Sequence, residues 1–453
     1  MKRTRLTAAV ATAITLAFAL AACGNGDDSA NVPAPTDTVP ADPTADPDPD
    51  PGPAPEGATI TMWVAGNDTP QELRDWLIAE FAAQNPGSTL VIEEQGWGDL
   101  VPQLITALPD AANTPDVVEI GNTQTPTFTP VGAFREISPE LFAELGGSDL
   151  LPSFVEIGTY DGRIYALPYY FGSRYMFFRS DIWGEAGLSV PTTLGEFTES
   201  AIALTTATQS GFAIGGQDWR NGISWIFAHG GNLATVEGTT WTSTLSDPNT
   251  IAGLEAWQEL FLGASNLPVT DRDVAYWDFL NDGTDDTPPL AATIMAPGWA
   301  RWSIGHLDEN GNRDGMADED TFDIFALPGV DGGIAPVFAG GSNLAISAQS
   351  QHPELAENLL RIIFSEDYQR MLGENGLGPA NANYTDSMGD SKFARTMIET
   401  AQASRLTPAA PGWAAIEAAF VYEELFQAIA EGGDVAAIAA EFDARLTPML
   451  NGN

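Results

Sequence analysis

The chain has 453 residues and carries 62 acidic against 18 basic side chains, which gives a formal net charge of −44 at pH 7. A net negative charge of this size excludes nucleic acid as a partner of the protein. An anionic membrane surface also repels the protein. Because Cys23 is the only cysteine, no intramolecular disulfide forms and a hydrophobic core must stabilise the fold. The length is sufficient for two domains.

The N-terminus has the pattern of an exported protein. Basic residues among the first five positions precede an apolar run from Leu6 to Leu20, which is typical of a secretory signal peptide. The run is shorter than the roughly 20 residues that cross a bilayer as a helix. The sequence therefore predicts a signal peptide over residues 1–22.

The cysteine follows small residues at the end of this run. The stretch LAACG at residues 20–24 resembles the lipobox of bacterial lipoproteins, in which the cysteine is lipidated and becomes the new N-terminus. This implies membrane attachment through a lipid on Cys23 alone, at the outer face of the cell membrane. The alternative is an incidental cysteine in an ordinary cleaved signal. Residues 23–57 are rich in proline and aspartate and poor in large apolar side chains, so we expect a disordered tether.

A strand followed by a helix is predicted directly after the tether. Ile60, Met62 and Val64 alternate with less apolar residues, as in a half-buried strand. The segment Thr69-Pro70-Gln71-Glu72 then supplies an N-cap threonine, a proline at the first helical position and a capping-box glutamate. Apolar residues follow at helical spacing, and residues 85–87 (NPG) stop the helix.

Further strands and helices are expected along the rest of the chain. Strands at 89–96 and 116–122 and a helix at 99–108 continue the alternation, which favours a mostly parallel α/β sheet. Later segments are predicted as a helix at 248–264, a strand at 291–302, and helices at 353–376, 392–403, 415–433 and 435–450.

Several segments, in this order and at this spacing, resemble one family: TMWVAGN, PDVVEIGNTQTPTFTPVGAFREIS, DGRIYALPYYFGSRYMFFRSDIW, PTTLGEF, TIMAPGWARW, GGSNLAIS and ELAENLLRIIFSEDYQRM. The chain is similar to the carbohydrate-binding lipoproteins of bacterial ABC importers, relatives of the maltose-binding protein. The resemblance implies an α/β, two-lobed periplasmic-binding-protein-like fold of type II, with a hinged ligand cleft. It places residues 58–169 and 337–404 in one lobe, and 170–336 and 405–453 in the other.

The resemblance also implies that the protein binds its ligand without catalysing a reaction. The protein is expected to bind a sugar, of two or a few units, and to deliver it to the permease of an ABC importer. It is expected to be a monomer and to need no cofactor and no metal.

Polar candidates for the cleft are carried over from the family by position. Loops after the first and third strands supply groups for sugar hydroxyls, the segment near residue 170 supplies the cleft floor, and a glycine-rich loop supplies the rim. These residues are Asn67, Asp68, Asn122, Thr123, Gln124, Tyr170, Phe171, Ser173, Arg174, Gly341 and Ser342.

Aromatic platforms are expected as well, because the C–H faces of a sugar stack on flat rings. The resemblance places Trp219, Asn221, Trp225, Trp299 and Trp413 at the cleft. Trp302 is added because it lies three residues after Trp299, and Trp97 because it lies on a strand-to-helix loop whose neighbours show no apolar periodicity. In contrast, the helical patterns around Trp76, Trp183 and Trp257 predict packing.

Three alternatives remain open at this point. A surface-anchored glycosidase needs two suitably spaced carboxylates, a weak criterion in so acidic a chain. The same fold also binds polyols or peptides, since fold alone does not fix the ligand. Finally, Asn310, Asn312, Asp314, Gly315 and Asp318 follow part of a calcium-loop pattern within residues 308–321, but Thr321 stands where a bidentate acid belongs.

Overall fold

The structure is a computed structural model, and it describes residues 57–452 except 273–274, 282–288, 308–310 and 312. The predicted signal peptide, Cys23 and nearly all of the predicted tether lie outside the described residues. Within the described ranges, no helix is long and apolar enough to cross a membrane.

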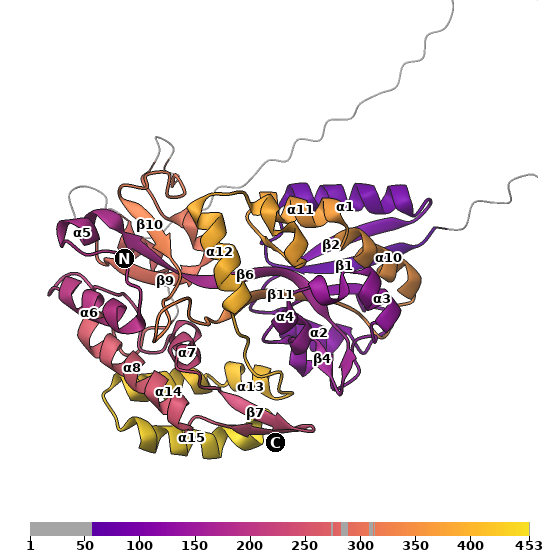
Figure 1. Cartoon of the computed structure of the whole chain (residues 1–453). Helices are drawn as coiled ribbons and strands as arrows, with labels where there is room; N and C mark the ends of the chain where they lie inside the picture. The colour runs from indigo at the N-terminus through magenta and orange to yellow at the C-terminus, as the bar shows by residue number, and fades with distance from the viewer. Residues whose placement is uncertain (1–56, 273–274, 282–288, 308–310, 312, 453) are drawn as a thin grey trace, which may run out of the picture. The chain divides into compact units, whose positions relative to one another are not determined.

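The first part of the chain forms a parallel sheet with crossover helices (Figure 1). Strand β1 (Thr59–Ala65) pairs with β2 (Thr89–Gln95) on one side and β3 (Val117–Gly121) on the other. The connections are α1 (Gln71–Gln84) and α2 (Leu100–Ala107). Ile60, Met62 and Val64 are buried, which confirms the predicted alternation of the first strand.

The predicted start of the first helix is wrong in its detail. Helix α1 begins after Pro70, without a side-chain cap. The hydroxyl of Thr69 instead forms a hydrogen bond of 3.1 Å with the hydroxyl of Tyr169. A buried partner 100 positions along the chain therefore outcompetes the local capping box.

Strand β6 (Leu167–Arg179) joins two halves of one sheet. Its residues 167–173 pair with β11 (Ala339–Ile346), which in turn pairs with β3. From Arg174 onward the strand pairs instead with β9 (Thr293–Pro297), and its last four residues pair with β10 (Phe322–Phe325). The strand thus changes partner between Ser173 and Arg174.

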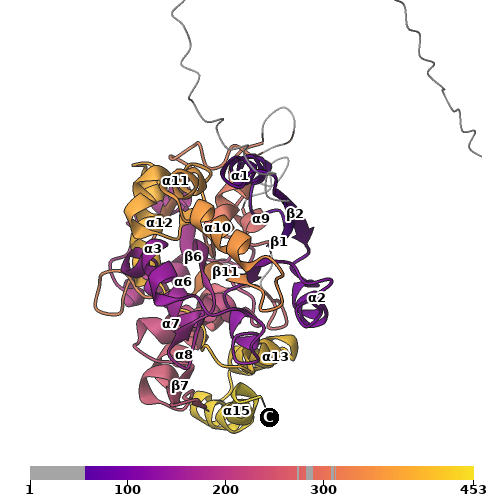
Figure 2. The same ribbon diagram turned by 90° about the vertical axis from the view of Figure 1, so that its right-hand side faces the viewer.

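Two separate large hydrophobic cores lie on either side of this change, and we call them the cores of the first and second lobe. The first contains side chains of β1, β2 and β3, with α1, α10 (Pro353–Ile363) and α11 (Glu366–Glu374). Figures 1 and 2 show these three helices side by side. The second core is rich in tryptophan and gathers around α8 (Pro248–Ala264), which packs on α6 (Leu194–Leu204), α7 (Trp219–Ala228), α14 (Val421–Ala430) and α15 (Val435–Leu450).

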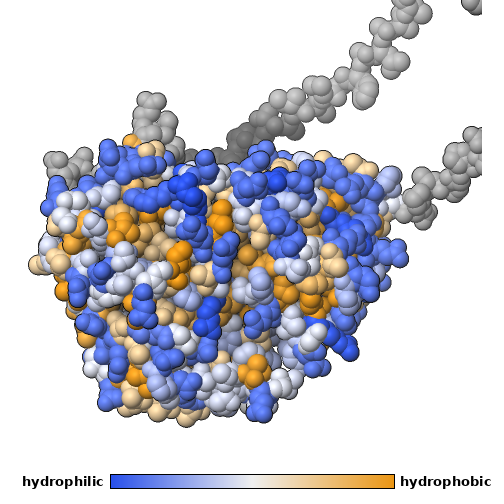
Figure 3. Space-filling view, viewed as in Figure 1, coloured by the Kyte–Doolittle hydropathy of each residue, from blue (hydrophilic) through white to orange (hydrophobic). Residues whose placement is uncertain are grey.

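The remaining elements connect the strands and helices described above and cover the two cores. They are η1 (Thr125–Thr127), α3 (Pro139–Glu144), η2 (Gly147–Asp149), α4 (Pro152–Ile157), β4 (Thr159–Tyr160), β5 (Arg163–Ile164), α5 (Ser180–Glu185), β7 (Ala234–Glu237), β8 (Thr240–Ser243), α9 (Trp277–Leu280), η3 (Gly298–Ser303), β12 (Gly378–Pro379), η4 (Ala382–Met388), α12 (Lys392–Ala403) and α13 (Trp413–Ala418). Helix α12 contributes Met397 to a further cluster with Tyr175 and Ile294. The face drawn in Figure 3 is mostly hydrophilic with scattered apolar patches.

Candidate functional site

A cavity of about 720 Å³ lies where the two lobes meet. Loops that follow β1, β2 and β3 supply one wall, β6 and β11 supply the floor, and residues of α7, α9 and η3 supply the opposite wall. Open α/β sheets bind ligands at the carboxyl ends of their parallel strands. This cavity is therefore the candidate functional site.

The structure brings together half of the residues that the sequence suggested. The predicted residues that line the cavity are Asp68, Trp97, Asn122, Thr123, Gln124, Tyr170, Arg174, Trp299 and Gly341. They come from both lobes, as a ligand cleft between hinged lobes requires.

Asp68 lines the cavity and also forms a hydrogen bond with the neighbouring Trp97 indole. Its Oδ2 atom accepts hydrogen bonds from Trp97 Nε1 at 3.1 Å and from the Tyr170 hydroxyl at 3.2 Å. Burial raises the pKa of the Asp68 carboxyl, while these two hydrogen bonds act in the opposite direction. The carboxylate thus fixes the orientation of the Trp97 indole at the cavity wall.

A fully buried acid lies beneath the cavity floor. Glu119, in the middle of β3, accepts hydrogen bonds from the Ala65 backbone N–H at 3.0 Å and from Ser342 Oγ at 2.6 Å. Burial raises the pKa of Glu119 to about 7, partly offset by the hydrogen bonds from Ser342 and from the Ala65 backbone. The sequence reasoning missed Glu119, although one acid within the apolar strand VVEIG is a recognisable signal.

The second lobe contributes a pair of indole rings. Trp277 and Trp299 both line the cavity, and their ring centroids lie 5.0 Å apart in an edge-to-face arrangement. The Trp299 side chain is 55 % exposed, so a ring face is available to a ligand. Trp277 was missed because it lies in an irregular part of the chain, in the short segment AYWDFL.

Cationic side chains and one amide complete the site. The guanidinium of Arg174 lies 5.5 Å from the ring centroid of Phe338, and that of Arg220 lies 4.6 Å from the ring of Trp219. Neither Arg220 nor Phe338 was predicted, although both line the cavity. The Asn122 amide donates to the Ala339 carbonyl at 2.9 Å, so it ties the loop after β3 to β11.

Nine predicted residues do not line the cavity: Asn67, Phe171, Ser173, Trp219, Asn221, Trp225, Trp302, Ser342 and Trp413. Trp219, Trp225 and Trp413 lie in the core of the second lobe with at most 1 % of their surface exposed. They present no free ring face for stacking. Trp183 and Trp257 are buried in the same core, which confirms their predicted packing.

Asn67 is exposed outside the cavity, and most of the other residues of that group are packed or hydrogen-bonded within the protein. The Asn221 amide donates to Asp218 Oδ2 and to the Met295 carbonyl. Phe171 packs in a small apolar cluster, Ser173 is buried, and Ser342 donates to Glu119. Trp302 is 61 % exposed but lies outside the cavity, with the Arg301 guanidinium 5.0 Å from its ring.

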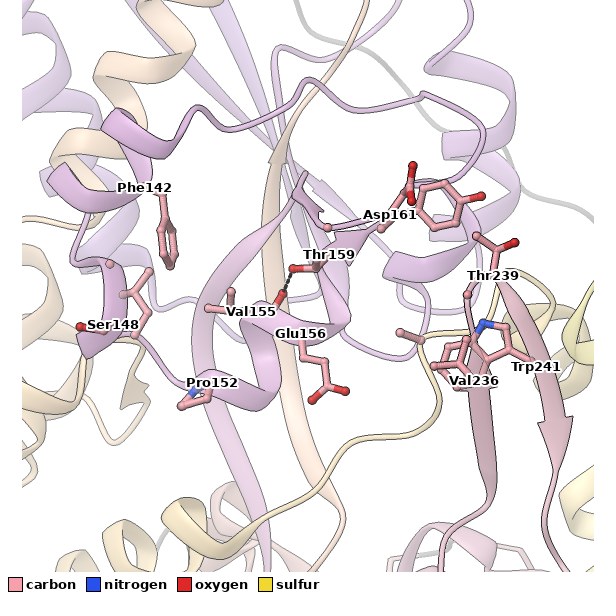
Figure 4. A pocket seen from close by; sticks show the side chains of 16 residues that line it. Phe142, Ser148, Pro152, Val155, Glu156, Thr159, Asp161, Val236, Thr239 and Trp241 are labelled. Atoms are coloured by element: carbon pink, nitrogen blue, oxygen red, sulfur yellow. Dashed lines mark hydrogen bonds between the residues drawn. The ribbon is translucent and has the colours of Figure 1, made fainter.

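A second cavity, of about 670 Å³, contains none of the predicted residues. Figure 4 shows Val236 and Trp241 on the hairpin β7–β8 across from Glu156, Thr159 and Asp161. The Thr159 hydroxyl is engaged with the Val155 carbonyl at 2.7 Å. The described parallel strands β1, β2 and β3 end at the first cavity and not at this one, so we do not assign the site to it.

The suggested calcium loop falls partly on residues outside the described ranges, among them Asn310 and Asn312. In its described part, Asp318 accepts hydrogen bonds from Thr321 Oγ1 at 2.8 Å and from His306 at 3.2 Å. The hydrogen bond from Thr321 is the main cause that lowers the pKa of Asp318. No group of three or more acidic, histidine or cysteine side chains within the described ranges is arranged to hold a metal ion.

Comparison with known proteins identifies relatives of the chain. Residues 65–370 match the family model described as bacterial extracellular solute-binding protein. The diacetylchitobiose binding protein DasA of Streptomyces coelicolor is 30% identical over 367 residues, which cover 80% of this chain and 82% of DasA.

Solved structures support the fold. The sugar-binding protein MalE of Xanthomonas citri superposes with a TM-score of 0.74 at 20% identity, over 86% of this chain and 97% of MalE. The GacH receptor of Streptomyces glaucescens, solved unliganded and with acarbose, gives a TM-score of 0.70 at 18% identity, over 87% of this chain and 98% of GacH. The fold is thus the two-lobed α/β fold of MalE-type binding proteins.

Proposed function

The chain belongs to the bacterial extracellular solute-binding proteins, and from that premise we propose that it binds an uncharged sugar of two or a few units in the cavity between its lobes. The sugar is then delivered to a membrane permease of an ABC importer. No bond is made or broken in this function.

The placement of three indoles on one cavity carries the proposal. Trp97 stands on the wall of the first lobe, and Trp277 and Trp299 stand on the wall of the second. A sugar presents C–H faces to flat rings and hydroxyls to polar groups at its edge. Asp68, Thr123 and Gln124 supply polar groups at the same cavity.

The relatives favour a sugar of more than one unit. DasA is named for diacetylchitobiose binding, and the MalE structure is described as a sugar-binding protein. The cavity volume of about 720 Å³ lies within the range of 300–1,000 Å³ that is common for ligand sites.

Binding is coupled to closure of the lobes. A sugar that contacts both walls favours the closed state by its differential affinity for that state. The change of strand partner between Ser173 and Arg174 supports a hinge along β6, between lobes of residues 58–169 with 337–404 and 170–336 with 405–453. A micromolar dissociation constant corresponds to about −8.2 kcal/mol, which the stacked rings and hydroxyl contacts supply together.

The same proposal includes the location of the protein. The family is extracellular, and the lipobox-like stretch at Cys23 supports anchoring by lipid to the outer face of the cell membrane. We propose that the anchored protein is a monomer. Such an anchor keeps the receptor near its permease.

Calorimetric titration against a panel of diacetylchitobiose, maltotetraose and mannitol tests this function. We expect saturable binding of at least one saccharide and no binding of mannitol. Tight binding of mannitol alone supports the polyol alternative. Chromatography of the incubated sugars separates the receptor from a hydrolase, because a receptor leaves every sugar intact.

A further inference from the structure

One carboxylate links the two walls of the cavity from behind. Glu417 Oε2 accepts a hydrogen bond from Thr123 Oγ1 at 3.1 Å, and Glu417 Oε1 lies 3.4 Å from the Arg220 guanidinium. Thr123 follows β3 in the first lobe, whereas Arg220 lies in the first turn of α7 in the second lobe. Both partners line the cavity, while Glu417 lines a smaller neighbouring one.

The carboxylate is held on a fixed support. Glu417 lies on α13, which is anchored in the second core by the fully buried Trp413 and Ile416. The same helix packs against η1, the turn that begins two residues after Thr123. The Glu417 side chain is only 13 % exposed, so its hydrogen bonds are shielded from competing water.

Charge strengthens this link. Burial raises the pKa of Glu417, and the Arg220 guanidinium is the main influence in the opposite direction. A hydrogen bond to a charged group stabilises more than one between neutral groups. An acid in this position therefore needs both Arg220 and the Thr123 hydroxyl as partners.

We propose that Glu417 is a positioning residue that fastens Thr123 of the first lobe to Arg220 of the second and thereby limits how far the cavity walls separate when no ligand is bound. The link between the lobes stands on the geometry alone. Its consequence for affinity rests on the proposed function. Thr123→Val removes the hydroxyl contact alone, Glu417→Gln removes the negative charge, and Glu417→Ala removes both contacts.

The first experiment measures lobe spacing without any ligand. Spin labels are attached at Ala83→Cys on α1 and Glu199→Cys on α6, both exposed positions, in the full chain with Cys23→Ser. Double electron–electron resonance then measures the distance between the two spin labels, which reports the separation of the lobes. We expect Thr123→Val and Glu417→Ala each to broaden or shift the distance distribution, with no further change when they are combined.

The control is Glu424→Ala, which removes an exposed acid of α14 that pairs with Arg445 and should leave the distribution unchanged. Glu417→Gln keeps an acceptor for Thr123 and should give an intermediate result. Unchanged distributions in both Thr123→Val and Glu417→Ala overturn the proposal, even if the protein binds sugar.

The second experiment measures the affinity for diacetylchitobiose. In Glu417→Ala the walls separate more widely, so bringing them together on the sugar costs more free energy. We therefore expect an affinity about tenfold weaker in Glu417→Ala and unchanged in Glu424→Ala. Equal or tighter binding by Glu417→Ala overturns the proposed role in ligand capture. If the wild-type chain binds another saccharide of the panel instead, the affinities are measured with that sugar; if it binds none, the proposed function fails, while the distance measurement still decides the link between the lobes.

Discussion

Trp97 Nε1 lies 3.1 Å from Asp68 Oδ2, so an acid that lines the cavity also holds one of its aromatic walls in place. The same oxygen accepts from Tyr170. Orientation of the Trp97 ring is therefore a role of Asp68.

Replacement of Asp68 should reduce affinity through Trp97. Asp68→Ala frees the indole, and we expect about a tenfold weaker affinity for the bound sugar, because ordering the ring then costs free energy on binding. Titration calorimetry measures the affinity, and the fluorescence anisotropy of the chain reports the mobility of its indoles. An unchanged affinity in Asp68→Ala would show that Trp97 needs no such support.

Trp299 and Trp302 form a matched pair for testing the aromatic wall. They are three residues apart and similarly exposed, but only Trp299 lines the cavity. Trp299→Ala should weaken sugar binding several-fold or more, since a stacked ring contributes about 0.5–1.5 kcal/mol beyond its buried area. Trp302→Ala should leave the affinity unchanged, and equal losses in both variants would contradict the assignment.

Trp225 should determine stability rather than recognition. Its side chain is fully buried in the core of the second lobe. Trp225→Ala should lower the free energy of unfolding by about 3–5 kcal/mol, because it leaves a large cavity. Denaturant unfolding measures this loss; a variant of native stability that has lost only sugar affinity would place Trp225 at the site after all.

Glu119 should make stability depend on pH. The folded chain holds the Glu119 proton up to about pH 7, whereas the group's ordinary pKa is 4.5. Between these values the folded state binds more protons than the unfolded state, so the free energy of unfolding falls as pH rises, by at most about 1.4 kcal/mol per pH unit.

Glu119→Gln removes this titration and keeps the size of the side chain. The difference in unfolding free energy between the wild-type chain and the variant should therefore change across pH 4.5–7 and stay constant above it. Urea unfolding at several pH values measures it. A difference that is the same at all pH values would mean that Glu119 titrates normally.

The lipid anchor has its own test. Cys23→Ser should block lipidation, and the protein should then be found in the medium or as an unprocessed precursor. Fractionation of cells that express the variant measures this, with Glu424→Ala as a control that retains Cys23. Membrane association of Cys23→Ser equal to that of the wild-type chain would refute the anchor.

Local patterns predicted most elements of the fold. The alternation of Ile60, Met62 and Val64 defined β1, and the expected helices of the C-terminal part are present as α10 to α15, with the segments 353–376 and 415–433 each divided into two helices. The expected mostly parallel sheet is wrong: in the large sheet of the described residues β1 pairs in parallel with β2 and β3, whereas the pairings that involve β6 and β11 are antiparallel. The capping box at Thr69 failed because the hydroxyl finds Tyr169, a partner that no local pattern reveals. Long-range hydrogen bonds of this kind are visible only in the folded chain.

The site was harder to predict than the fold. Positions carried over from the family placed Trp225 at the cleft, although its neighbours Ile223 and Ile226 form an apolar run that indicates a core helix. Trp277 and Glu417 come from segments without a motif, and only the meeting of distant loops brings them near Thr123. Residue type alone does not distinguish a buried ring from one that lines a cavity.

The central claim is that both lobes close on one sugar in the cavity between them. The distance between spin labels at residues 83 and 199, followed during titration with diacetylchitobiose, tests it most directly. The account predicts that the distance changes in step with binding and saturates with it, and that Trp299→Ala shifts both curves to higher sugar concentration. Saturable binding without any change in distance, or binding that is unaffected when Trp97 and Trp299 are both replaced by alanine, would contradict it.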